Sequence, residues 1–227
     1  MRLVIVGCEY SGTTTLAHAI NDWATETRGV GFRLIHDHFK QPDTNPHGPA
    51  LTEDELAQFQ ALSARHREVM QRQNLYYHTS YTANSESKET SLVVGLHIDE
   101  TIYGPLYFGY GGAGQIGDRH VIAKHIEQRI VQYTPETVLV HVKARSDIIR
   151  QRMTQDPHAR AVLRETDVEH VLARFEEEVR GSLLMNKITL DTSDATVAET
   201  VADFERKVHP FLTQEDLARI LVHRSLK

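Results

Sequence analysis

Apolar residues along this chain form short runs that alternate with longer stretches of helical spacing. Five runs rich in aliphatic and β-branched residues predict strands at residues 2–6, 32–36, 92–98, 137–142 and 187–190. Apolar positions three or four residues apart predict helices at 14–24, 52–74, 119–133, 167–180 and 197–208, with a terminal helix near 214–226. Strands that alternate with crossover helices are typical of a parallel sheet covered on both faces. We therefore expect one domain over residues 1–227, with a three-layer α/β/α fold and a mainly parallel five-stranded sheet.

Composition narrows the class of protein. Hydrophobic residues make up 40% and charged residues 25% of the 227 positions, as in soluble globular chains. The formal net charge of −6 disfavours a general binder of nucleic-acid backbone, although it leaves room for a local basic pocket. Cys8 is the single cysteine, which excludes an internal disulfide and a cysteine-rich zinc site. No leader peptide or membrane-spanning run is visible, so we expect a cytoplasmic protein without membrane partners.

The first predicted strand runs directly into a glycine-bounded loop and then into a helix. Glycines allow backbone N–H groups to curl around an anion, and a helix N-terminus adds partial positive charge. Gly7 and Gly12 match the glycines of the phosphate-binding pattern G-x-x-x-x-G-K-[ST], and Thr14 matches its magnesium-binding hydroxyl. Thr13 stands where the pattern has lysine. Three interpretations stay open: a working loop with its cation supplied from elsewhere, a loop that binds without catalysis, and a plain strand-to-helix turn.

The stretch GCEYSGTTTL, residues 7–16, resembles the P-loop of nucleoside and nucleotide kinases, and most of all that of the thymidylate kinase group, apart from Thr13. The order of elements continues the resemblance over about residues 1–208. It implies a P-loop fold that binds ATP and Mg²⁺, with the nucleotide held by Gly7, Ser11, Gly12, Thr13, Thr14 and Thr15.

Acidic residues follow the second and third predicted strands. In similar kinases, a carboxylate after the second strand contacts the acceptor and takes its hydroxyl proton; Asp37 is the best match, and capping of the next segment is the alternative. Asp99 ends an apolar run, which indicates a magnesium-binding acid together with Thr14. Glu100 stands where thymidylate kinases have a phosphate-binding arginine, which departs from their pattern.

Basic residues gather after the fourth predicted strand. In similar kinases the following helix carries a mobile lid, expected here near residues 150–166, whose arginines bind the transferring phosphoryl group. Arg150 and Arg152 are the expected replacements for the missing lysine, followed by Arg145, while Arg160 lies further along. A solvated helix face is the alternative.

Two other features allow further interpretations. Tyrosines and phenylalanines alternate with glycines over residues 103–114, which indicates either a stacking wall for a flat acceptor or a packed aromatic loop. His36 and His38 flank Asp37, and His97 precedes Asp99, so a metal centre built from both strand ends is conceivable.

The leading hypothesis is a phosphotransferase that moves phosphate from a nucleoside triphosphate to a small acceptor, expected to be a nucleoside or nucleoside monophosphate. Asp37, Asp99, Arg150 and Arg152 are its expected catalytic residues. A kinase of another metabolite or of a modified base in DNA, a nucleotide-binding regulator without catalysis, and a metal-assisted hydrolase are alternatives. Association with a second copy of the chain is left open.

Overall fold

A computed structural model of the chain describes residues 1–32, 34–38, 52–79, 90–158 and 161–227. The strands are β1 (Arg2–Val6), β2 (Leu34–Asp37), β3 (Ser91–Val94), β4 (Val138–Lys143) and β5 (Asn186–Asp191). The helices are α1 (Thr13–Arg28), α2 (Glu53–Gln60), α3 (Ala64–His78), α5 (His97–Tyr107), α6 (Arg119–Tyr133), α7 (Ser146–Gln155), α8 (Val168–Gly181), α9 (Val197–Val208) and α10 (Gln214–Ser225), with single 3₁₀ turns η2 (Glu165–Asp167) and η3 (His209–Phe211).

All five strands form one parallel sheet in the order β2-β3-β1-β4-β5, which confirms the expected architecture. Ile5 pairs with Val94 on one side and Val140 on the other, and Val94 also pairs with Asp37. The carboxyl ends of β1, β2 and β3 therefore lie side by side. Ligands of open parallel sheets bind beyond such ends.

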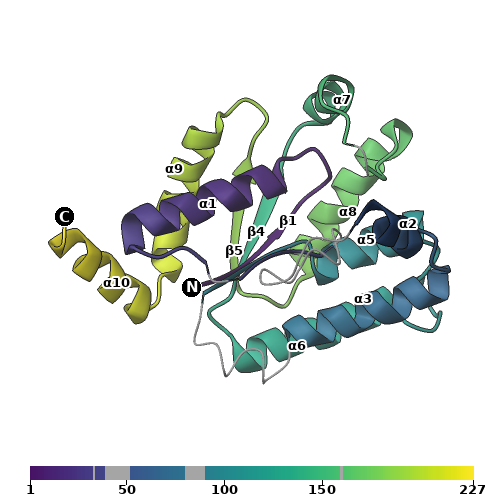
Figure 1. Cartoon of the computed structure of the whole chain (residues 1–227), viewed down its shortest axis with the longest axis horizontal. Helices are drawn as coiled ribbons and strands as arrows, with labels where there is room; N and C mark the ends of the chain where they lie inside the picture. The colour runs from purple at the N-terminus through teal and green to yellow at the C-terminus, as the bar shows by residue number, and fades with distance from the viewer. Residues whose placement is uncertain (33, 39–51, 80–89, 159–160) are drawn as a thin grey trace.

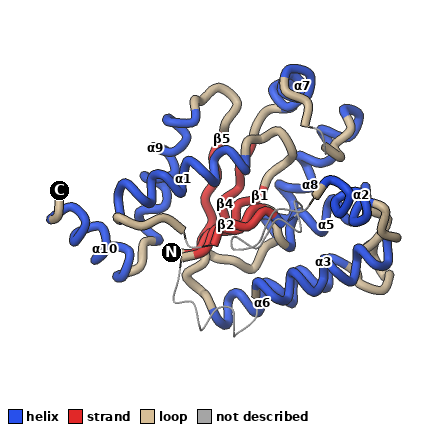
Figure 2. The backbone as a smooth tube through the Cα atoms, in the orientation of Figure 1, coloured by secondary structure: helices blue, strands red, loops and turns tan. Residues whose placement is uncertain are grey.

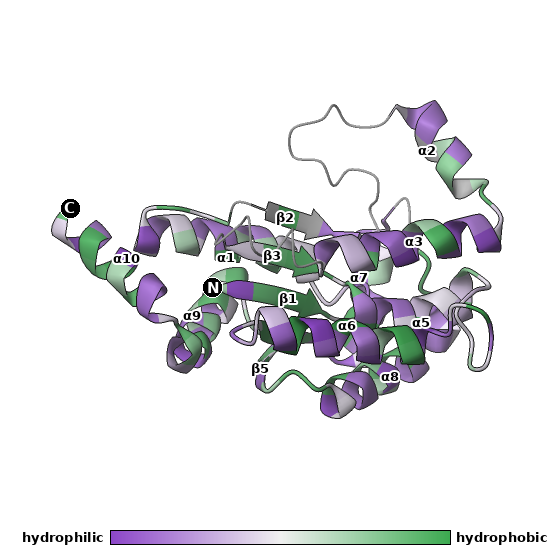
Figure 3. Cartoon of the chain, turned by 90° about the horizontal axis from the view of Figure 1, so that it is seen from below, coloured by the Kyte–Doolittle hydropathy of each residue, from purple (hydrophilic) through white to green (hydrophobic). Residues whose placement is uncertain are grey.

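Alternate residues of β1 supply the two faces of the sheet, as the two-residue period of a strand requires. Leu3 and Ile5 pack in a cluster with residues of α1 and α9, whereas Val4 and Val6 pack with residues of α5, α6 and α8. Figure 1 shows α1, α9 and α10 on one side of the sheet and α3, α5, α6 and α8 on the other. Figure 2 shows the strands enclosed between these layers, and in Figure 3 β1 and β3 carry hydrophobic colours.

Two predicted elements are wrong in their extent. The run at 92–98 does not continue as a strand: β3 ends at Val94, and α5 begins at His97 after Gly95 and Leu96, which have φ angles of 85° and 72°. Asp99 and Glu100 consequently lie in the first turn of a helix. The helix predicted over 52–74 is two helices, because the Ser63 side chain accepts a hydrogen bond from the backbone N–H of His66 and caps a new helix, α3.

Some predictions concern residues outside the described part of the chain, and one concerns membrane-spanning segments. The structure does not describe Arg160 or residues 40–50, where three prolines and one glycine predict an irregular loop. Within the described part, none of the helices combines the length and the apolar character that crossing a membrane requires.

Candidate active site

The loop between β1 and α1 has a backbone shaped for close approach. A Cβ atom at Gly7 would overlap the carbonyl oxygen of Val142 on β4, so only glycine fits there. Gly12 has a φ angle of 93° and precedes α1 without a side-chain cap, and the space where its Cβ would lie is open among the described residues. The first N–H groups of α1 lack intrahelical partners. This end of the helix can therefore bind an anion.

Side chains from three other elements hold this loop. The hydroxyl of Tyr103 accepts a hydrogen bond from the backbone N–H of Glu9 at 2.9 Å. The Arg152 guanidinium donates to the carbonyl of Tyr10 at 2.9 Å, and the Thr192 hydroxyl donates to the carbonyl of Ser11 at 2.8 Å. Tyr10 itself has a φ angle of 66°, which a residue with a side chain rarely adopts. The loop is thus fixed in a strained shape by α5, α7 and the turn after β5.

Glu9 and Tyr10 also bind the segment that follows α7. The Glu9 carboxylate accepts hydrogen bonds from the backbone N–H groups of Val162 at 3.0 Å and Leu163 at 2.7 Å. The Tyr10 hydroxyl accepts one from the backbone N–H of His158, and the two rings stack at 4.4 Å. Burial raises the pKa of Glu9. The segment expected to act as a lid is therefore connected directly to the glycine-bounded loop.

Carboxylates from β2 and α5 meet beside the start of α1. The Thr14 hydroxyl donates to Asp37 at 3.2 Å. Asp99 is buried, and its Oδ1 atom has no hydrogen-bond partner among the described residues. Burial raises the pKa of Asp99 well above its ordinary value, and the negative charges of Asp37, Glu100 and Glu9 add to that shift. The structure brings Thr14, Asp37 and Asp99 to one place, as the sequence analysis expected, and among the described residues the Oδ1 atom of Asp99 has no partner there.

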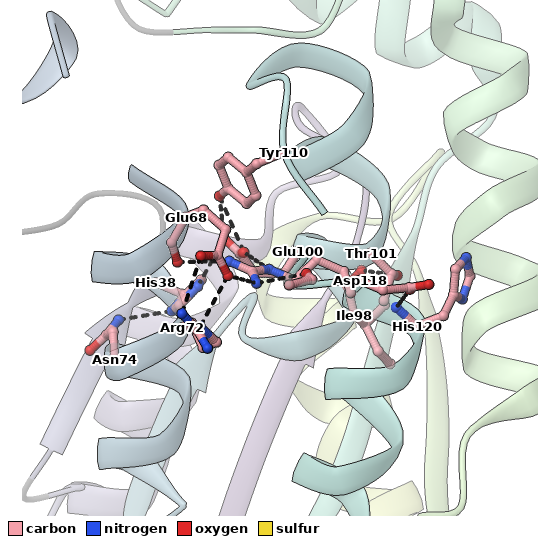
Figure 4. A network of polar contacts seen from close by, with 12 residues as sticks. His38, Glu68, Arg72, Asn74, Ile98, Glu100, Thr101, Tyr110, Asp118 and His120 are labelled. Carbon is pink, nitrogen blue, oxygen red and sulfur yellow. Dashed lines mark hydrogen bonds and ion pairs between the residues drawn. The ribbon is translucent and has the colours of Figure 1, made fainter. Parts of the chain in front are cut away.

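Glu100, the next residue, lies in a buried network that satisfies its charge (Figure 4). Its carboxylate accepts hydrogen bonds from Arg119 Nε at 2.6 Å and from the Tyr110 hydroxyl at 3.0 Å, and lies 3.2 Å from His38 Nε2. Although burial alone would raise the pKa of Glu100, the hydrogen bonds and charges of His38 and Arg119 lower it. Arg119 Nη1 also donates to Glu68 at 2.9 Å. Asn74 and Arg72 extend the network through His38 and Glu68.

Sequence reasoning missed Arg119 and Glu68 as members of this network. Both lie in regular helical stretches, and the pairs that they form span 19 and 51 residues of sequence. The local signal is the position of Arg119 at the start of its helix, after a glycine-rich stretch and the capping residue Asp118.

The three arginines that the sequence analysis singled out have different partners in the structure. Arg152 reaches the glycine-bounded loop through Tyr10 and also donates to the hydroxyl and carbonyl oxygens of Thr192. Arg150, on the same helix, donates instead to Glu169 of α8 at 2.5 Å. Arg145 pairs with Asp194 and Asp147. Of the three, only Arg152 contacts the loop.

Comparisons with known proteins bear on this arrangement. No family model and no curated protein matches the chain. Solved structures do: a thymidylate kinase from Ehrlichia chaffeensis, with 13% identity and a TM-score of 0.54, matches over 91% of this chain and 97% of its own. A deoxyadenosine kinase from M. mycoides with dCMP and dCDP bound has 13% identity and a TM-score of 0.53, over 92% and 100%. The YorR protein of Bacillus subtilis in complex with phosphorylated GDP has 12% identity and a TM-score of 0.54, over 94% and 100%. The chain has the fold of the P-loop nucleoside and nucleotide kinases.

In this kinase fold, the aromatic and glycine-rich stretch after β3 divides between packing and the site. Tyr103 and Tyr110 are buried and bond the P-loop backbone and Glu100. Phe108 lies with its ring 6.2 Å from that of Tyr110, and the Arg67 guanidinium lies 4.8 Å from the centre of the Phe108 ring. A packed loop therefore accounts for Tyr103 and Tyr110, while Phe108 and Arg67 offer a partly buried aromatic and cationic surface beside Glu68.

The metal interpretation finds limited support in this fold. Among the residues that the structure describes, no three or more His, Cys, Asp or Glu side chains are grouped to hold a metal ion by themselves. His38 bonds Glu100 and Asn74, and His97 lies 3.2 Å from Glu127. The side chain of His36 lies outside the description. An ion held partly by a phosphate ligand remains compatible with the P-loop site, because Mg²⁺ usually keeps several waters and takes one or two carboxylates plus substrate phosphates.

Proposed function

We propose that the chain is an ATP-dependent phosphotransferase whose acceptor is a nucleoside or nucleoside monophosphate. The observation that carries the proposal is Asp99, a buried carboxylate with an unpartnered oxygen beside Thr14, Asp37 and the P-loop. A buried charge without a partner is costly, so a site that retains one is suited to a cationic ligand. The thymidylate kinase and the deoxyadenosine kinase with a similar fold support the choice of acceptor.

The P-loop would bind the donor phosphates. Gly12 leaves open space over the first turn of α1, and the N–H groups of that turn, which have no partners within the helix, would supply donors. Ser11, Thr13 and Thr15 complete the expected phosphate-binding set around this turn. The hydroxyl of Thr13 carries no charge, so the cation that a lysine would give must come from elsewhere.

Arg152 is the residue that we assign to this cationic role. Its guanidinium already lies at the P-loop, where it bonds the carbonyl of Tyr10. Burial lowers the pKa of Arg152, yet the ordinary value is so high that the group stays charged. Arg150 is dropped from the catalytic set, because its ion pair with Glu169 joins α7 to α8.

Oxygen ligands at the site fit Mg²⁺. Thr14 and Asp99 would hold the ion, since a hydroxyl and a carboxylate are ligands of the kind that Mg²⁺ prefers. The bound ion would neutralise charge on the transferring phosphoryl group. Asp37 would orient the acceptor and accept a hydroxyl proton, and its bond from Thr14 fixes the direction of its carboxylate.

The residues 150–166 are proposed to act as a lid. Glu9 and Tyr10 bind backbone groups of this region, so binding at the P-loop and placement of the segment would be linked. The link supplies a physical route by which donor binding excludes water from the site.

The test is release of ADP from ATP and Mg²⁺ in the presence of separate pools of nucleosides, nucleoside monophosphates, other phosphorylated metabolites and hydroxymethylated DNA. We expect turnover with one nucleoside or nucleotide pool and a loss of at least about 100-fold in Asp99→Asn. Asp22→Asn, an exposed carboxylate on α1, is the matched control and should keep full turnover. Equal turnover in Asp99→Asn and the wild type would remove Asp99 from the site.

A nucleotide-binding regulator without catalysis is the second candidate, and Thr13 at the lysine position favours it. It predicts saturable ATP binding with no labelled product in any pool. Turnover in a metabolite or DNA pool would instead keep the phosphotransferase and change the acceptor.

A further inference from the structure

A groove of about 590 Å³ lies between α3 and α6, away from the site described above. Figure 1 shows these two helices side by side along one edge of the molecule. The groove is lined by aromatic, cationic and amide side chains and one valine: Val69, Arg72, Gln73, Tyr76 and Tyr77 of α3, and Arg129 of α6. None of these residues belongs to the P-loop, to β2 or to α5, so the groove is separate from the candidate active site.

The lining carries two guanidinium groups and no carboxylate. Arg72 is already paired, since its Nε lies 3.1 Å from Glu68 Oε1. Arg129 forms no ion pair with any residue that the structure describes, and its Nε donates to the carbonyl of Thr79 at 3.2 Å. The two Nη groups hold four of the five N–H donors of a guanidinium, and they make no hydrogen bond within the described part of the chain. The recognition of an anion would therefore rest on Arg129.

Aromatic rings hold Arg129 in place. Its guanidinium carbon lies 5.7 Å from the centre of the Tyr76 ring and 5.9 Å from that of Tyr133. Attraction between a cation and the faces of two rings, together with the bond to Thr79, restricts a side chain that is otherwise long and flexible. Arg129 is also half-buried, so salt screens its charge less than that of a fully exposed arginine. Its Nη donors are thus held at the wall of the groove before any ligand arrives.

We propose that this groove binds a small organic anion, a flat ring that carries a phosphate monoester or a carboxylate. Two oxygens of the anion would accept hydrogen bonds from the Nη groups of Arg129, because the planar fork of a guanidinium matches such a pair. The ring would pack on Tyr77, whose side chain is 67% exposed, and the exposed amide of Gln73 would meet its polar edge. A water molecule takes about 30 Å³ in the liquid, so the groove admits roughly twenty non-hydrogen atoms.

The groove is connected to the buried network through Glu68. Its Oε1 atom lies 3.1 Å from Arg72 Nε and accepts a hydrogen bond from Arg119 Nη1 at 2.9 Å. Arg119 in turn bonds Glu100, the neighbour of Asp99. An anion in the groove would attract Arg72 and weaken its pair with Glu68, which would leave that carboxylate to Arg119. This regulatory consequence rests on the proposed function, whereas binding in the groove does not.

The test uses phenyl phosphate and benzoate as anionic probes and benzyl alcohol as their neutral analogue. Binding is followed by two-dimensional NMR of the ¹⁵N-labelled full chain, with ADP and Mg²⁺ present to shield the P-loop. We expect shifts to concentrate at residues 69–77 and 129, and at least one anion to bind ten-fold more tightly than benzyl alcohol. The tighter of the two anions identifies the charged group. Equal binding of all three probes would overturn the proposal, as would shifts confined to residues 7–16.

Variants separate a built site from general attraction of anions. Arg129→Gln should weaken binding of the tighter probe at least ten-fold. Arg180→Gln, an exposed arginine of α8 outside the groove, should leave it unchanged. Wild-type affinity in a folded Arg129→Gln chain would overturn the proposal. Should that variant fail to fold, Tyr77→Ala decides instead, because it removes an exposed ring, and unchanged affinity there would equally overturn the proposal.

A second copy of the chain is the competing occupant of this groove. Sedimentation velocity of the wild type and of Tyr77→Ala, each with and without the tighter probe, distinguishes the two. A wild-type monomer that binds the probe would support the proposal. A wild-type dimer that does not bind the probe, and that Tyr77→Ala converts to a monomer, would overturn it.

If the phosphotransferase activity is present, occupied and empty grooves should also differ at least two-fold in turnover. A change with the tighter probe that disappears in Arg129→Gln would support the regulatory link. Binding without any such change would overturn the link and keep the site. Failure of the proposed function itself would leave the NMR result standing, so the two failures are distinguishable.

Discussion

Two clusters of carboxylates meet at the first turn of α5, and the protein treats their charges in opposite ways. Glu100 accepts from Arg119 and Tyr110 and faces His38, which lowers its pKa. Asp99 is also buried, but its Oδ1 atom has no partner among the described residues, and burial raises its pKa. The two adjacent carboxylates have different surroundings because consecutive residues of a helix point about 100° apart. The difference separates Glu100, whose partners belong to the fold, from Asp99, which we propose as a ligand of the bound ion.

The largest effect is expected from removing Arg119, the cation that bonds Glu100. Arg119→Met should lower the free energy of unfolding by about 3–5 kcal/mol, because Glu100 and Glu68 would remain buried without the guanidinium that bonds both. Urea unfolding of the purified variant measures the loss. Adding Glu100→Gln should restore part of it, and a loss below about 1 kcal/mol in the single variant would show that the network contributes little.

Glu127 is another buried carboxylate with hydrogen-bond partners, and its contribution to stability should depend on pH. Glu127 lies 3.2 Å from His97, the first residue of α5, and accepts from the backbone N–H of Leu183. Burial would raise its pKa, but the contacts with His97, Ser182 and Leu183 lower it to about 2. Glu127→Gln should cost roughly 2 kcal/mol at pH 7.

The sign of its pH dependence follows from the lowered pKa. The stabilisation is present above the ordinary pKa of a glutamate and is lost as pH falls toward about 2. The difference between Glu127→Gln and the wild type should therefore shrink below about pH 4.5, as followed by urea unfolding at a series of pH values. Exposed Glu26→Gln is the control, and a difference that stays constant with pH would contradict the prediction.

The unsatisfied carboxylate should behave in the opposite direction. Asp99→Asn should raise the free energy of unfolding by about 1 kcal/mol at neutral pH in the absence of Mg²⁺, since it removes a buried charge without a partner. A raised pKa means that the stability of the wild type falls as pH rises through that value, and the variant should lack this fall. Thermal unfolding at several pH values measures both. Destabilisation by Asp99→Asn would mean that a hydrogen-bond donor or a cation satisfies Asp99 in the folded chain.

The smallest effect should come from a surface pair. Arg150→Gln should change the free energy of unfolding by no more than about 0.5 kcal/mol, because its partner Glu169 is exposed. Turnover should stay within two-fold of the wild type, whereas Arg152→Gln should lose most of it. Parallel kinetics of the two variants provide the comparison, and equal losses would return Arg150 to the catalytic set.

The sequence predicted those parts of the fold that depend on local patterns. Residues 119–133 and 197–208 match α6 and α9, because Asp118 and Thr196 cap them and their apolar spacing is regular. The β1–loop–α1 unit followed from an aliphatic strand and two glycines. Ser63 was also a local signal, a capping residue inside a predicted helix, but the helical spacing on either side outweighed it.

The remainder of the site depends on contacts that no local pattern encodes. Residues 92–98 are almost uninterrupted apolar sequence, so nothing except Gly95 marked the end of β3 before α5. The sequence analysis expected Asp37 and Asp99 at neighbouring strand ends. Asp99 lies instead in the first turn of α5, which begins so soon after β3 that the residue stays near that edge of the sheet. The pairing of Glu100 with Arg119 could not be foreseen, since burial and distant partners decide it.

The turn between β3 and α5 has a consequence for how this chain can change over generations. Only Gly95 and Leu96 separate the two elements, and both have positive φ angles. One inserted residue would rotate the helix by about 100°, so that Asp99 would take the direction that Glu100 has now and Glu100 would lose it. Single substitutions in this helix leave its direction unchanged, whereas a change in the length of the connection would turn the whole helix. An alignment of related chains should therefore show no gaps at this point, even where almost every side chain has been replaced.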